Sequence, residues 1–248
     1  MCYNSICKAE GKPPKPERKT ELKNVLAVID TETTNITATE KVTPGNNLVY
    51  NFGYKFVTPA DGAELLTRSY IIDEIFNGEQ ERMQSAYYAD KLPTYHVGIA
   101  DGTYTVISFF AAMVEFAKLC EQYKVTAIVA HNARFDVDAL NTTARWLTGL
   151  DYIRALPQNI EIWDSLKMAK SIFYQRPSYR EFCQANGFMT KHATPRPQLT
   201  AEVLYRFITG DTNFEEEHTA LADVLIETEI ILACYRAHKA FERVLFPV

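Results

Sequence analysis

The residues of this chain that are best suited to chemistry are two carboxylates that end an apolar run. Val25–Ile29 is apolar throughout and is followed directly by Asp30-Thr31-Glu32. The run is rich in β-branched side chains and is typical of a buried strand. Because side chains alternate between the faces of a strand, Asp30 and Glu32 are expected to point the same way.

Two neighbouring carboxylates that lose hydration are tolerated mainly where a cation binds between them. The pair therefore predicts a site for Mg²⁺ or Mn²⁺, because both of these hard cations prefer oxygen ligands. The alternative is a strand end that carries Asp30 and Glu32 in a solvated turn. This segment by itself does not separate the two interpretations.

Two further segments combine acidic, amide and imidazole side chains. His131-Asn132-Ala133-Arg134-Phe135-Asp136 follows a second apolar run, Val125–Ala130, and His218-Thr219-Ala220-Leu221-Ala222-Asp223 precedes a long helical pattern. Each has an ordinary explanation, since an acidic residue at a helix start often caps the helix or complements its dipole. All three segments, in this order and at these places, form a much stronger signal.

The hydrophobic periodicity predicts strands first and then strands that alternate with helices. Further strands are expected at Leu48–Val57, Thr67–Ile72, Val125–Ala130 and Ile160–Trp163, with either a strand or a helix start at Thr103–Phe109. Helices are expected at Ala111–Tyr123, Phe135–Leu147, Ser165–Tyr174 and Thr219–Ala240. This order predicts a mixed α/β sheet that is covered by helices.

The composition excludes several classes of protein. The chain has 248 residues, 47% of them apolar, which is enough for a large core. A net charge of -5 argues against a histone-like nucleic-acid binder, so attraction to a polyanion must be local or mediated by metal. The five cysteines lack CxxC pairs, and we find no secretory or membrane-spanning segment. A reducing cytoplasm fits these features best.

The domain organisation predicted from the sequence is a tail and one domain. Residues 1–23 are rich in proline and lysine and are expected to form a flexible basic tail, with residues 24–248 as the domain. A weak phosphate-contacting arm is the functional alternative for the tail.

With these motifs, the chain resembles the DEDDh 3′-to-5′ exonucleases, a DnaQ-like group of the ribonuclease H-like superfamily. The family motifs match as follows: Asp-x-Glu at Asp30 and Glu32, Asn-x-x-(Phe/Tyr)-Asp at Asn132, Phe135 and Asp136, and His-x-x-x-x-Asp at His218 and Asp223. The resemblance spans Asn24–Ala237, and Tyr50–Lys91 looks more like phage-encoded members than like bacterial proofreading subunits.

The resemblance implies a ribonuclease H-like mixed five-stranded sheet flanked by helices. The implied activity is metal-dependent 3′-to-5′ hydrolysis of single-stranded nucleic acid, with DNA favoured and nucleoside 5′-monophosphates released. Implied partners are single-stranded 3′ ends and a polymerase or other replication or recombination protein in trans, without a membrane, in the cytoplasm of a bacterial or phage-infected cell. The oligomeric state stays open. The alternatives are a 3′-to-5′ exoribonuclease and a non-catalytic nucleic-acid-binding protein on the same fold.

The resemblance also implies a role for each motif residue. Two divalent cations, Mg²⁺ or Mn²⁺, would be held by four carboxylates, with Asp30 bridging both, Glu32 and Asp223 on one and Asp136 on the other. His218 would be the general base, because an imidazole can accept a proton near neutral pH. The implied substrate contacts are Thr33, Thr34, Asn132 and Phe135.

Two details of the sequence bear on this site. Within a single helix, His218 and Asp223 would lie about 140° apart, so His218 is expected in the loop before a helix that starts near Thr219. The preceding Glu215–Glu217 should favour the protonated imidazole, whereas bound metal ions should oppose it. Many family members also have glycine where this chain has Asn35, which predicts a differently shaped loop after the first motif.

Overall fold

The central strand of the sheet, β1 (Val25–Thr33), continues through both carboxylates of the first motif. A computed structural model describes residues 24–35 and 46–246, so the predicted tail, residues 1–23, lies outside the described residues. Alternate side chains of β1 enter two different cores: Ala27 and Ile29 one, Leu26 and Val28 the other. Burial on both faces explains why the first part of the strand, Val25–Ile29, is apolar without a break.

Six strands form one sheet in the described part of the chain, in the order β4-β3-β2-β1-β5-β6. The strands that follow β1 are β2 (Val49–Thr58), β3 (Ala63–Ile72), β4 (Thr105–Ile107), β5 (Val125–Ala130) and β6 (Glu161–Asp164). β2 pairs antiparallel with β1 and β3, and the other pairs are parallel. The predicted mixed α/β class is therefore confirmed.

The sheet differs from the expected five strands by one short edge strand. The strands β3-β2-β1-β5-β6 account for the expected five, and β4 adds a sixth beside β3. The sequence allowed either a strand or a helix start at Thr103–Phe109, and the structure contains both. β4 ends at Ile107, and Ser108 caps α4 (Phe109–Gln122) by accepting the Ala111 N–H. A strand of three residues is too short to reveal itself by alternation.

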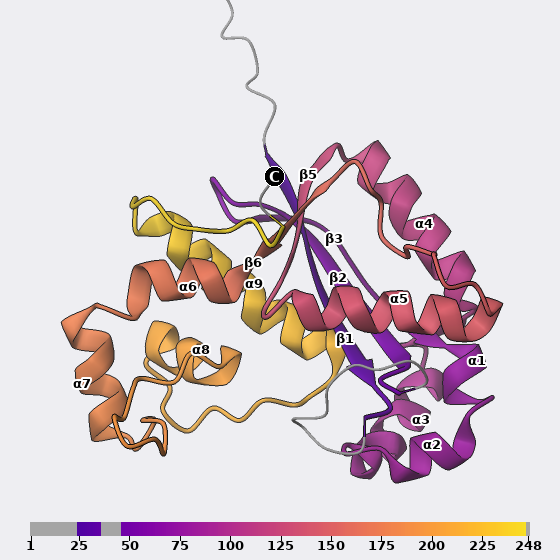
Figure 1. The fold of residues 1–248 in the computed structure, drawn as a ribbon, viewed down its shortest axis with the longest axis horizontal. Coiled ribbons are helices and arrows are strands. Elements are labelled where there is room, and N and C mark those ends of the chain that lie inside the picture. Colours follow the sequence, from indigo (N-terminus) through magenta and orange to yellow (C-terminus); the bar gives the residue numbers. More distant parts are fainter. Residues whose placement is uncertain (1–23, 36–45, 247–248) are drawn as a thin grey trace, which may run out of the picture.

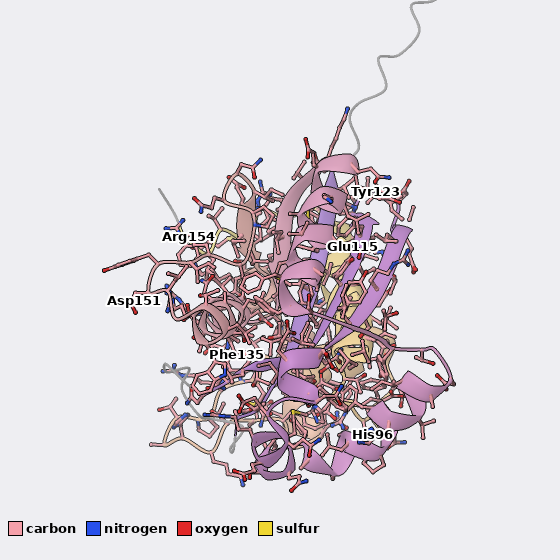
Figure 2. The ribbon with its side chains drawn as sticks, turned by 90° about the vertical axis from the view of Figure 1, so that its right-hand side faces the viewer. His96, Glu115, Tyr123, Phe135, Asp151 and Arg154 are labelled. Atoms are coloured by element: carbon pink, nitrogen blue, oxygen red, sulfur yellow. The ribbon has the colours of Figure 1, made fainter. Side chains whose placement is uncertain are left out.

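Helices cover both faces of the sheet (Figure 1). On one face lie α4 and α5 (Arg134–Thr148), and Figure 2 shows Glu115 of α4 and Tyr123, which follows α4, in front of the strands. Glu115 accepts a hydrogen bond of 2.6 Å from the Tyr70 hydroxyl. On the other face lie α6 (Ser165–Phe173), α7 (Pro177–Ala185), α8 (Ala201–Thr209) and α9 (Ala220–Arg236).

The sequence between β3 and β4 forms a group of short helices, which lies beyond one end of the sheet (Figure 1). It contains α1 (Asp73–Phe76), α2 (Gln80–Ser85), the 3-10 helix η1 (Ala89–Lys91) and α3 (Leu92–Ala100). In the described ranges, no helix combines the length and the apolar character needed to cross a membrane. Cys120, Cys183 and Cys234 are buried and free, as expected from the cysteine spacing.

The start of α9 is fixed against β2 directly opposite the first motif. In the β1–β2 register, Glu32 faces Asn51 and Asp30 faces Gly53. The Asn51 side chain accepts the Ala220 N–H at 3.1 Å, and Gly53 lies against the Ala220 carbonyl. Because a side chain at residue 53 would occupy the space of that carbonyl, glycine permits the close approach of helix to strand. The first turn of α9 is thereby held over the two carboxylates.

We expect Gly53→Ala to destabilise the protein and to displace α9. The added Cβ would overlap the Ala220 carbonyl, which is backbone and cannot rotate away. Overpacking of this kind costs about 1–3 kcal/mol, to be measured as the free energy of unfolding in urea. The control is Leu65→Ala on β3, since Leu65 is exposed. Wild-type stability of Gly53→Ala would contradict the proposed seating of α9.

Candidate active site

Three carboxylates from two distant parts of the sequence meet at the start of α9. Asp30 and Glu32 follow the parity of Leu26 and Val28 and so face the side of the sheet that α9 covers. Asp223 comes from the first turn of α9. One carboxylate oxygen from each of the three lies within 4.8 Å of the others. The prediction that Asp30 and Glu32 point the same way is confirmed.

Like charges in a buried place dominate the electrostatics of this cluster. Burial, followed by the neighbouring carboxylates, raises the pKa of Asp30 and of Glu32 well above their usual range. Burial first, and then Glu216 and Glu217, raise the pKa of Asp223 to about 8. Each group therefore resists ionisation unless positive charge is brought close to it.

The donor set fits a divalent cation. Asp223 Oδ1 is buried and has no hydrogen-bond partner among the described residues. A buried polar atom without a partner is costly, and a hard cation that prefers carboxylate oxygens would satisfy it. The cluster is thus compatible with metal binding.

Asp136 joins this cluster from the other side of the sheet. It lies in the first turn of α5, is 3% exposed and accepts a hydrogen bond of 2.9 Å from the Thr31 hydroxyl. Burial raises the pKa of Asp136 to about 7. Its charge in turn contributes to the raised pKa of Asp30 and of Glu32. The structure therefore brings the four predicted carboxylates into one electrostatic group.

His218 lies directly before the N-cap of α9, as the spacing predicted. Its backbone is left-handed, with φ of 54°, and the Thr219 side chain caps the helix by accepting the Ala222 N–H. The imidazole stacks on the Tyr88 ring with centroids 4.6 Å apart and planes 21° apart. His218 Nδ1 lies 3.7 Å from the Glu216 carboxylate.

Glu215–Glu217 do not determine the direction in which the His218 pKa shifts. Burial first, and then the charge of Lys91, lower the pKa of His218 below its usual value. The charges of Glu202 and Asp90 act in the opposite direction but do not outweigh these effects. Burial also raises the pKa of Glu216 to about 7.

The predicted substrate contacts differ in their exposure. Asn132 is exposed and Phe135 is half-buried at the start of α5, whereas Thr33 and Thr34 are buried. The Thr33 hydroxyl donates to the Asn35 side chain at 2.9 Å, and the Thr34 hydroxyl accepts the Leu48 N–H at 3.2 Å. Both threonine hydroxyls thus make hydrogen bonds within the protein. Contact of these four residues with a nucleotide stays a prediction.

The side chain of Asn35 makes a contact that glycine could not make. It accepts the Thr33 hydroxyl, and the Asn35 carbonyl accepts the Tyr87 N–H at 2.7 Å. The end of the first motif is thereby joined to the segment between α2 and η1. That same segment carries Tyr88, which stacks on His218.

Sequence reasoning missed several residues that shape the site. Glu227 and Asp164 are buried, and each accepts a backbone N–H of the turn before α5, from His131 and Asn132 respectively. Glu227 follows Asp223 by one helical turn on a largely apolar helix, and that spacing was a readable signal. No signal in the sequence identified Tyr88, because its contact with His218 depends on the tertiary fold.

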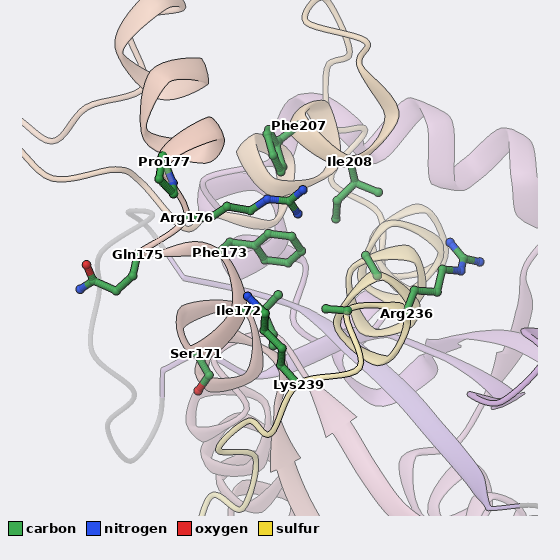
Figure 3. Close-up of a pocket in the computed structure, with 12 residues that line it drawn as sticks. Ser171, Ile172, Phe173, Gln175, Arg176, Pro177, Phe207, Ile208, Arg236 and Lys239 are labelled. Carbon is green, nitrogen blue, oxygen red and sulfur yellow. The ribbon is translucent and has the colours of Figure 1, made fainter.

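A cavity of about 780 Å³ lies apart from this cluster. It is formed by α6, α7, α8 and the carboxyl end of α9, and Arg176, Arg236 and Lys239 project around it (Figure 3). None of the predicted site residues lines it. The candidate active site is therefore a carboxylate cluster at the start of α9 rather than this cavity.

Comparisons with known proteins found similar structures only. No family model and no curated protein matches the chain. A full-length 3′-exonuclease is 12% identical, with 89% of this chain and 85% of that chain covered and a TM-score of 0.49. The nuclease domain of 3′hExo, a DEDDh family member bound to rAMP, is 13% identical, with 91% and 98% covered and a TM-score of 0.48.

Escherichia coli exonuclease I in complex with a dT13 oligonucleotide is 14% identical, with 85% of this chain covered and a TM-score of 0.47. This chain spans 40% of the length of exonuclease I. All three structures have a TM-score below 0.5, so their likeness transfers no activity to this chain. Its function has to be inferred from the geometry of the site and from the motifs.

Without divalent cations, we expect the protein to lose stability as the pH rises from about 4 to about 8. Unfolded Asp and Glu ionise near pH 4, whereas the folded pKa values are raised to about 7 for Asp136 and about 8 for Asp223. Within this window the folded state binds more protons than the unfolded state, so raising the pH favours unfolding. Thermal midpoints in chelator at pH 5 and pH 8 measure the effect.

Mg²⁺ should raise the midpoint more at pH 8 than at pH 5, since it binds the ionised carboxylates. Asp223→Asn removes one of the repelling charges, so it should flatten the pH dependence and reduce the effect of Mg²⁺. An undiminished effect of Mg²⁺ in Asp223→Asn would show that the ion binds elsewhere.

Proposed function

We propose that this chain is a metal-dependent 3′-to-5′ exonuclease of the DEDDh family, which releases nucleoside 5′-monophosphates from single-stranded ends, with DNA favoured. One observation carries the proposal. Asp30, Glu32, Asp136 and Asp223 converge from β1, α5 and α9, and His218 lies directly before the same helix. Carboxylates grouped in this way suit the binding of cations that act on a phosphodiester.

The four carboxylates would hold two divalent cations, Mg²⁺ or Mn²⁺. Asp30 would contact both, Glu32 and Asp223 would hold one, and Asp136 would hold the other, directly or through water. When bound, such ions neutralise charge on the scissile phosphate and lower the pKa of water. The placement of Asp136 apart from the three-carboxylate group supports a division between two ions.

His218 would accept the proton of the attacking water. Its lowered pKa keeps the imidazole neutral near pH 7, and only the neutral ring can accept a proton. Stacking on Tyr88 restricts the rotation of the ring.

The 3′-terminal nucleotide would contact Asn132 and Phe135, with Thr33 and Thr34 shaping the adjoining end of β1. Single-stranded 3′ ends are the proposed partner, and a polymerase or other replication or recombination protein would act with this chain in trans. With a net charge of -5, attraction of the polyanion would depend on the bound cations.

Hydrolysis of 5′-labelled single-stranded DNA and RNA of one sequence tests the activity and the preferred polymer. We expect a ladder of shortened products with Mg²⁺ or Mn²⁺ and none with chelator, and faster loss of DNA than of RNA. Asp30→Asn should abolish the ladder, because it removes the carboxylate proposed to contact both ions. Asp151→Asn is the matched control, since Asp151 is exposed.

Activity in chelator, or in Asp30→Asn, would contradict the metal mechanism. Binding of the labelled strand without any cleavage would instead favour a non-catalytic nucleic-acid-binding protein.

His218→Ala should lower kcat by about 10²–10⁴-fold, which is the usual contribution of a general base. Binding of single-stranded DNA should change little, because the imidazole acts on the water. Single-turnover rates with saturating enzyme measure the effect. His238→Ala is the control, since His238 is also left-handed but is exposed and lies beyond α9. A wild-type rate for His218→Ala would overturn the assignment.

A further inference from the structure

The turn between β5 and α5 leads directly to Asp136 and has an unusual backbone. Asn132 has a φ of 64°, in the left-handed region that costs free energy for residues other than glycine. Such a conformation persists only where the surroundings hold it. The contacts that hold this turn therefore help to determine where the Asp136 carboxylate lies.

Two buried carboxylates accept the consecutive backbone N–H groups of this turn. Glu227 Oε2 accepts the His131 N–H at 3.0 Å, and Asp164 Oδ1 accepts the Asn132 N–H at 3.1 Å. Glu227 is 3% exposed and Asp164 is 5% exposed. Asp164 has a second task, because it also caps α6 by accepting the Leu166 N–H at 2.9 Å.

The His131 side chain anchors the same turn to other elements. Its Nε2 must donate to the Leu199 carbonyl at 2.8 Å, so its Nδ1 accepts the Ser165 hydroxyl at 2.9 Å. These contacts join the turn to α6 and to the segment before α8. Glu227, in contrast, joins it to α9, the helix that carries Asp223.

Burying the Glu227 carboxyl group at this position costs free energy. The charges of Asp136 and Asp223 add to the effect of burial in raising the pKa of Glu227 well above its usual value. Glu227 nevertheless accepts the His131 N–H, and either a carboxylate or an amide oxygen can serve as that acceptor.

We propose that Glu227 is a positioning residue, which sets the place of Asp136 relative to Asp30, Glu32 and Asp223 by holding the His131 N–H. One helix then carries both a ligand of the first cation and the group that fixes the ligand of the second. The inference rests on the proposed function and deepens it.

Glu227→Met and Glu227→Gln form a matched pair of variants. Methionine fills a similar volume without the acceptor, whereas glutamine keeps an acceptor oxygen without the charge. Mn²⁺ binding, measured by calorimetry and by electron paramagnetic resonance without nucleic acid, reports the number and the affinity of bound ions. Variants are compared after thermal midpoints in chelator show that they fold, and Glu227→Leu replaces Glu227→Met if the latter does not.

The wild type should bind two Mn²⁺ ions. Glu227→Met should bind one Mn²⁺ ion with unchanged affinity and the second at least tenfold more weakly. The affinities of Glu227→Gln for both ions should stay within threefold of those of the wild type. On single-stranded DNA, kcat should fall in Glu227→Met while KM stays within threefold. If Glu227 had a purely structural role, Glu227→Met would lower the affinity for both Mn²⁺ ions by a similar factor.

Wild-type Mn²⁺ binding by Glu227→Met, equal weakening of both ions, or a loss in Glu227→Gln as large as in Glu227→Met would overturn the positioning role. If the wild type itself binds two ions and degrades DNA, those results contradict this inference alone. A wild type that binds no Mn²⁺ contradicts the proposed function and the inference with it.

Discussion

Repulsion among buried carboxylates is the constraint on which the rest of this structure depends. Asp30, Glu32, Asp136 and Asp223 are held close together at one end of β1, and Glu227 adds a fifth acidic group behind them. The cost of that arrangement is visible in their raised pKa values and in the unpaired Asp223 Oδ1. Burying such groups together destabilises the fold unless cations offset their charge, so the arrangement suggests that cations bind there.

The rest of the fold can be understood as the means of holding these groups in place. Asn51 and Gly53 seat the first turn of α9 on β2, opposite Glu32 and Asp30. Thr31, between the two carboxylates of β1, holds Asp136 on the opposite face. Neighbouring side chains of one strand thus reach carboxylates from two helices that cover different faces of the sheet.

Much of this could be predicted from the sequence, because it depends on local patterns. The parity of β1 places Asp30 and Glu32 on one face, and the spacing of His218 and Asp223 places His218 outside the helix. Asn51, Tyr88 and Asp164 could not be found in this way, since each acts through a contact with a residue distant in the sequence. The lowered pKa of His218 could not be found in this way either, because it depends on burial and on the charge of Lys91, which is distant in the sequence.

The central claim is that two cations bind among these carboxylates. Anomalous diffraction from crystals grown with Mn²⁺ would locate such ions directly. The account predicts two peaks about 3.5–4 Å apart, one among Asp30, Glu32 and Asp223 and the other between Asp30 and Asp136. An ordered cluster without a peak, or peaks that avoid Asp30, would contradict it.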